Sequence, residues 1–160
     1  MQHDKVKLLE RHEVGAVLLT CMDFRFRDSC RRAAFSGAVL KAFDIGDFDE
    51  IRLAGGAKNI SSPDKPGRLE TALDDLRLAV GKHHARRIVL ITHQNCGKYA
   101  ADGYVFTDSE TERVFHEREL RLAGNIVFRH FPETEILLGY ARLDDDDTIH
   151  VERVKHSAAS

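Results

Sequence analysis

The sequence of 160 residues has little that would direct it to a membrane, to nucleic acid or to a disulfide-stabilised fold. No run approaches the ~18 consecutive apolar residues that cross a bilayer. Residues 1–12 are polar and contain no apolar stretch of the signal-peptide type, so we expect a cytoplasmic protein. The net charge is only −2, which gives no reason to expect nucleic acid or a membrane as a partner. The three cysteines do not form a disulfide framework, because their number is odd, and they are better explained as metal ligands or buried thiols.

The composition is typical of a folded, soluble domain. Hydrophobic residues make up 42% of the chain and charged residues 31%, and the length fits one domain over residues 1–160. There is no internal repeat, low-complexity segment or linker. We expect residues 1–12 to form an arm or a short helix, and residues 155–160 to form a frayed tail.

Strand-like and helix-like segments alternate along the chain. Apolar runs predict strands, and apolar residues at helical spacing predict helices. Thr107 followed by Glu110 predicts a capping box at the start of the last helix, and Pro132 closes it. The expected strands are 14–20, 49–53, 86–92, 135–143 and 148–154, and the expected helices are 26–41, 69–80 and 107–131. This order predicts an α/β fold with a mainly parallel sheet of about four strands, an antiparallel edge strand and helices on both faces.

Chemically reactive side chains follow two of the predicted strands. Cys21 comes at the end of the first, and His93 and Cys96 follow the third. If these strands are neighbours where the strand order reverses, the three side chains converge. Two thiolates and one imidazole are ligands that zinc prefers. Cys30 is not an equally good ligand, and we expect it to be a buried, apolar residue.

Asp23 and Arg25 lie beside the first of these ligands, and two roles for Asp23 remain open. Its carboxylate can be the fourth zinc ligand, which closes the site. Alternatively, Arg25 holds Asp23 by a charge-assisted pair and leaves the fourth position to water, which Asp23 then orients. Two thiolates donate much charge to zinc, so we expect the water to ionise at higher pH than on a three-histidine site, and activity to favour alkaline pH.

The pattern Cys21-x-Asp23-x-Arg25, followed later by His93-x-x-Cys96-Gly97, resembles the β-class carbonic anhydrases. Residues 52–56 are similar to that family's Arg-Asn-Ala-Gly segment, and residues 67–73 to its helix before the third strand. The resemblance implies a carbonate dehydratase that hydrates CO2 reversibly to bicarbonate by zinc-bound hydroxide. It further implies zinc on Cys21, His93 and Cys96, a catalytic pair formed by Asp23 and Arg25, and a homodimer or dimer-based oligomer.

Several features leave the substrate site open. Leu53 stands where the family usually has asparagine, and it changes either the pocket or the packing beneath it. Gly55 and Gly56 either present N–H groups to bicarbonate or form a tight turn that lets their loop pack. Tyr99 either lines the pocket or packs its helix. Two other functions therefore stay open: a zinc hydrolase of another small CO2-like molecule, and a non-catalytic module with a closed, structural zinc site.

Overall fold

The computed structural model describes residues 12–26, 35–144 and 148–156. The predicted arm at residues 1–12 lies outside them apart from His12, as do Cys30 and the tail from residue 157. The strands are β1 (Ala16–Cys21), β2 (Phe48–Leu53), β3 (Arg87–His93), β4 (Glu135–Leu143) and β5 (Ile149–Val154). The helices are α1 (Phe35–Phe43), α2 (Lys58–Ser61), α3 (Arg68–Lys82), α4 (Gly97–Ala101) and α5 (Ser109–His130), and Phe24–Phe26 forms a 3₁₀ turn.

The five strands form one sheet in the order β2-β1-β3-β4-β5. The first four run parallel, and β5 pairs antiparallel with β4. This confirms the predicted fold class. From β1 the chain moves outward to β2 and then crosses to β3 on the other side, so the strand order reverses between β1 and β3.

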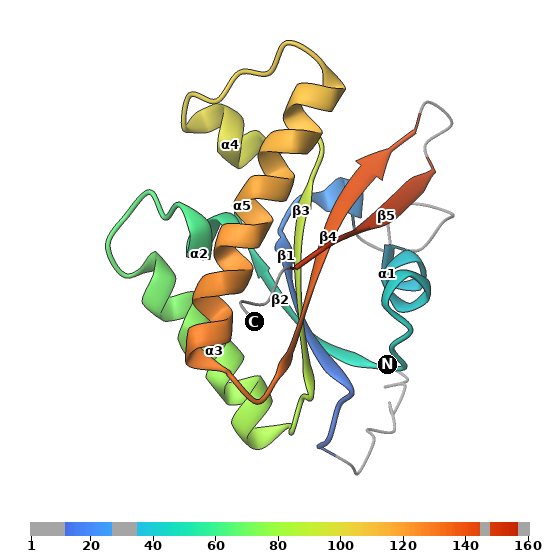
Figure 1. Cartoon of the computed structure of the whole chain (residues 1–160), viewed down its shortest axis with the longest axis vertical. Helices are drawn as coiled ribbons and strands as arrows, with labels where there is room; N and C mark the ends of the chain where they lie inside the picture. The colour runs from blue at the N-terminus through green and yellow to red at the C-terminus, as the bar shows by residue number, and fades with distance from the viewer. Residues whose placement is uncertain (1–11, 27–34, 145–147, 157–160) are drawn as a thin grey trace, which may run out of the picture.

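The sheet is covered on both faces, as the almost wholly apolar central strands predict. Alternate residues of each strand point to opposite faces. On one face, Val17 and Leu19 of β1 pack with buried residues of α3 and α5. On the other face, Ala16 and Leu18 pack with α1. Figure 1 shows this layering, with α2, α3 and α5 on one side of the sheet and α1 on the other.

Several helices differ from the prediction. Of the helix expected over 26–41, Phe26 lies in the 3₁₀ turn, residues 27–34 lie outside the described part of the chain, and α1 covers the rest and continues to Phe43. The N-cap of α5 is Asp108, whose side chain accepts a hydrogen bond from the Thr111 N–H, and Thr107 is not the cap. The short helices α2 and α4 were not predicted, because four or five residues are too few to establish helical spacing.

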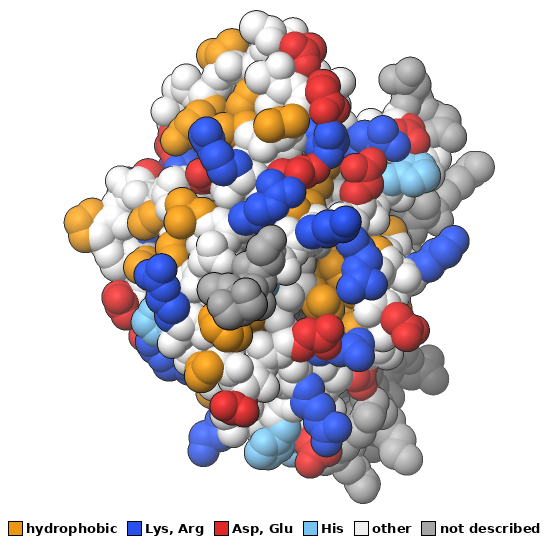
Figure 2. All heavy atoms as spheres, in the orientation of Figure 1, with side chains coloured by type: hydrophobic (Ala, Val, Ile, Leu, Met, Phe, Trp, Pro, Cys, Tyr) orange, Lys and Arg blue, Asp and Glu red, His pale blue; other side chains and the backbone are white. Residues whose placement is uncertain are grey.

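The surface in Figure 2 has acidic and basic side chains intermixed. Much of this mixture lies on α5, where Arg113 pairs with Glu110 and Arg121 pairs with Glu117. Among the described residues, no helix is both long and apolar enough to span a bilayer.

Candidate metal centre

The carboxyl ends of β1 and β3 bring the three predicted ligands together. Cys21 is the last residue of β1, His93 is the last residue of β3, and Cys96 directly precedes α4. Their ligand atoms all lie within 4.8 Å of one another, and the two sulfur atoms are 3.9 Å apart. All three side chains are buried. The expected convergence at the reversal of strand order is therefore present.

The imidazole of His93 is oriented as a metal ligand requires. Its Nδ1 lies 2.8 Å from the carbonyl oxygen of Gln94, which can only accept, so Nδ1 carries the proton. The lone pair is therefore on Nε2, which is buried and has no hydrogen-bond partner among the described residues. The ring also packs against Phe26, with the centroids 4.4 Å apart. A buried, unpartnered nitrogen beside two sulfur atoms fits zinc well.

The pKa values of the two thiols are shifted in opposite directions. A hydrogen bond from Cys96 lowers the pKa of Cys21 to about 4, against the opposing effect of burial. The N–H of Gly55, 3.3 Å from the Cys21 sulfur, acts in the same direction. The same hydrogen bond to Cys21, together with burial, raises the pKa of Cys96. The Cys21 sulfur is thus held as a thiolate, which is the form that binds metal.

Asp23 and Arg25 form the predicted pair beside these ligands. Arg25 Nε lies 3.0 and 3.1 Å from the two oxygens of Asp23, and a terminal nitrogen lies 2.6 Å from Oδ2. Asp23 Oδ2 is also 3.9 Å from Nε2 of His93. Burial opposes ionisation of Asp23, but the hydrogen bonds from Arg25 outweigh it and hold the pKa of this carboxyl below its usual value. Asp23 is therefore an ionised acceptor next to the ligand group.

Residues 93–96, which we call the ligand turn, are fixed by contacts from several elements. The N–H of Gln94 donates to the carbonyl of Ala141 on β4 at 2.9 Å. Asn95 has the left-handed φ of 53°, which asparagine adopts more readily than most residues. Its carbonyl accepts from Arg25 at 2.9 Å, and its N–H donates to Glu112 on α5 at 2.6 Å. Sequence analysis missed Glu112, because α5 is distant in sequence and its periodicity gives no sign of this contact.

Gly55 and Gly56 pack close to the ligands. The N–H of Gly55 donates to Cys21, and that of Gly56 donates to the Leu53 carbonyl at 2.8 Å. A Cβ on Gly56 would lie 2.7 Å from the Ile91 carbonyl oxygen and 3.0 Å from the Cys21 nitrogen. These contacts favour the tight-turn role, and the predicted contact of both glycines with bicarbonate stays a prediction.

Comparison with solved structures identifies the fold. A carbonic anhydrase from Glaciozyma antarctica matches with a TM-score of 0.56 and 18% identity, over 96% of this chain and 89% of that one. A β-carbonic anhydrase of Aspergillus fumigatus matches with a TM-score of 0.50 and 14% identity, over 92% and 78%. This chain has the β-carbonic anhydrase fold. No family model and no curated protein sequence matches it.

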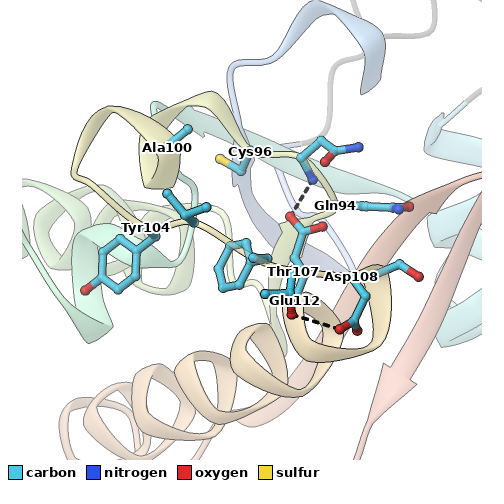
Figure 3. Close-up of a pocket in the computed structure, with 11 residues that line it drawn as sticks. Gln94, Cys96, Ala100, Tyr104, Thr107, Asp108 and Glu112 are labelled. Atoms are coloured by element: carbon cyan, nitrogen blue, oxygen red, sulfur yellow. Dashed lines mark hydrogen bonds between the residues drawn. The ribbon is translucent and has the colours of Figure 1, made fainter.

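In this β-carbonic anhydrase fold, a pocket of about 520 Å³ opens beside Cys96. Its lining combines apolar residues after α4 with polar residues at the start of α5 (Figure 3). Tyr99 does not line it: the ring is buried between α4 and α5, and the phenol lies 3.5 Å from Glu119. Leu53 does not line it either, but packs against the core on the α3 face of the sheet. For Leu53 these contacts favour a role in packing over a role in the pocket.

Proposed function

We propose that the protein is a zinc-dependent carbonic anhydrase that interconverts CO2 and bicarbonate. The observation that carries this proposal is the pairing of Asp23 with Arg25 beside three buried ligands. Both oxygens of Asp23 accept from Arg25, and this pairing supports the open form of the site, in which the fourth zinc position is left to water. The fold of the chain supports the same conclusion.

Cys21, His93 and Cys96 would hold the zinc. Zinc would supply Lewis-acid activation of a water molecule, and the resulting hydroxide is the nucleophile that CO2 hydration requires. Asp23 would accept a hydrogen bond from this water and direct it, because its lowered pKa keeps the carboxylate ionised. Arg25 fixes the position of Asp23 and, through the Asn95 carbonyl, ties it to the ligand turn.

The alternative of a different small substrate has no specific support here. It depended on Leu53 reshaping the reaction site, and Leu53 packs against the core on the α3 face and does not line the pocket beside Cys96. The alternative of a closed, structural zinc requires Asp23 to leave Arg25 and bind the metal. We include in the same proposal a homodimer or dimer-based oligomer and a cytoplasmic location. Measuring the mass of the protein in solution tests the oligomeric state.

The proposal is tested by measuring bound zinc and CO2 hydration on one preparation. We expect one zinc per chain and hydration that increases from neutral pH to about pH 9, since ionisation of the water limits the rate. Cys96→Ser is the matched control for background hydration. Stoichiometric zinc with no hydration anywhere in this range would contradict the proposal, and carbon disulfide hydrolysis by the same sample would favour the other substrate class.

A further inference from the structure

Glu112 is a buried carboxylate directed at the ligand turn. It lies in the first turn of α5 and is 4% exposed. Its Oε1 accepts the N–H of Asn95 at 2.6 Å and lies 3.6 Å from Nε2 of His116. Figure 3 shows the side chain extending from α5 toward the backbone between Gln94 and Cys96. Burying a carboxylate is costly, so a short hydrogen bond to one backbone N–H calls for an explanation.

The N–H group that donates to Glu112 belongs to Asn95, where the chain turns between His93 and Cys96. Asn95 has a positive φ, and Cys96 follows it directly. Glu112 holds the N–H side of Asn95, and Arg25 holds its carbonyl side. The peptide units on both sides of this residue are thus fixed from α5 and from the segment after β1. Their orientation decides where the Cys96 sulfur points.

We propose that Glu112 is a positioning residue that sets the direction of Cys96 toward the metal through the Asn95 N–H. This inference rests on the proposed zinc site. Hydrogen-bonded groups one step behind the ligands orient them, and losing one lowers metal affinity roughly 10- to 100-fold. What Glu112 supplies is a well-placed acceptor oxygen, so its position matters more than its charge.

Two conservative variants separate the position of the acceptor from its charge. Glu112→Asp keeps the charge but draws the carboxylate back by about 1.5 Å, beyond hydrogen-bond distance. We expect zinc affinity to fall roughly 10- to 100-fold in this variant. Glu112→Gln keeps an oxygen in place, and we expect a loss of no more than about fivefold, because neutral acceptors are somewhat weaker. Affinity is measured by competition with a chromophoric chelator, and the visible spectrum of the cobalt-substituted protein reports ligand geometry.

Glu119 is the matched control, since it is also a buried carboxylate on α5. It is 8% exposed, and it accepts hydrogen bonds from the hydroxyls of Ser61 and Ser62 at the end of α2, at 2.8 and 2.5 Å. Glu119→Asp should lower the free energy of unfolding but leave zinc affinity and the cobalt spectrum unchanged. If it weakened zinc as strongly as Glu112→Asp, the effect would be one of stability and the inference would fail.

The remaining outcomes also decide the question. Unchanged zinc affinity in Glu112→Asp would overturn the inference while leaving the zinc enzyme intact. So would a larger loss in Glu112→Gln than in Glu112→Asp, because charge would then matter more than position. If the aspartate variant did not fold, a loss above tenfold in the glutamine variant would still overturn the inference. Wild-type protein without zinc affinity would instead contradict the proposed function itself.

Discussion

The segments after β1 and after β3 both contribute to the candidate site, but they are held very differently. In the ligand turn, His93 is 1% exposed and Cys96 4% exposed. In residues 22–25, which we call the Asp23 segment, Met22 is 61% exposed and Phe24 66% exposed. The ligand turn contacts β4, α5 and Arg25, whereas Asp23 depends mainly on its neighbour Arg25.

Under the proposed function, this difference in burial and contacts predicts different roles for the two segments. Buried ligands with fixed backbone favour tight metal binding, because little has to be reorganised when the metal arrives. A partly exposed carboxylate held by one side chain can change partners by rotating. We therefore expect changes in the ligand turn to affect zinc, and changes in the Asp23 segment to affect turnover with zinc still bound.

The largest effect is expected from the ligand turn. Cys96→Ser should lower the affinity for zinc at least about 100-fold, because one ligand supplies roughly a quarter of a zinc-binding free energy near 12 kcal/mol. CO2 hydration should be lost together with the metal. Metal content after dialysis and chelator competition provide the measurement. Stoichiometric zinc in Cys96→Ser would show that the turn does not supply a ligand.

A second large effect is expected at Gly56, which packs against the ends of β1 and β3. The φ of this residue is +54°, and an added Cβ would meet backbone atoms of both β1 and β3. Gly56→Ala should lower the free energy of unfolding by about 3 kcal/mol, as overpacking and positive φ act together. Gly97→Ala is the control, since no atom of the described residues lies within 4 Å of a Cβ added there. Equal urea midpoints for the two variants would contradict the close packing of the Gly56 loop.

The fold and the convergence of Cys21, His93 and Cys96 could be predicted because their signals are local in sequence. Apolar runs mark β1 and β3, and Cys21 and His93 stand at their ends. The general rule that sites form where strand order reverses then brings them together. The contact of Glu112 with Asn95 could not be predicted in this way. It depends on how α5 lies over the ligand turn, and no pattern within either segment encodes that distance.

Helix ends show the same limit on a smaller scale. Thr107 and Asp108 are both good N-cap residues, and a sequence pattern cannot choose between neighbours when both fit. The structure selects Asp108, which accepts from both the N–H and the hydroxyl of Thr111. The role of Leu53 was likewise undecided in sequence, since it depends on which face of β2 meets the core.

A moderate effect is expected from Arg25, and it should fall on turnover. Arg25→Ala removes the donors that fix Asp23, and we expect CO2 hydration to fall between about 10- and 100-fold, as misplacement of an orienting group does. Zinc affinity should fall less than hydration and much less than in Cys96→Ser. Arg25 also bonds to the Asn95 carbonyl in the ligand turn, but Glu112 still holds the N–H side of that residue. Stopped-flow hydration and metal analysis on one sample test this difference. If zinc and activity fell in parallel, the division of tasks between the two segments would be wrong.

The smallest effect is expected in the acid stability of the metal-free protein. The folded-state pKa of Asp23 lies below its ordinary value of 3.8, so the folded protein binds fewer protons than the unfolded chain near that pH. The stabilisation from Asp23 is therefore present above pH 3.8 and is lost as the pH falls through the folded pKa. Between neutral pH and these acidic conditions, we expect Asp23→Asn to lose about 1 kcal/mol less unfolding free energy than the wild-type protein, a value typical of a partly exposed ion pair. Urea unfolding with a chelator present, at about pH 6 and about pH 2.5, measures it. If the two proteins lost equal stability between these pH values, Arg25 would not be stabilising the ionised carboxylate, and the Asp23 segment would be held by other contacts.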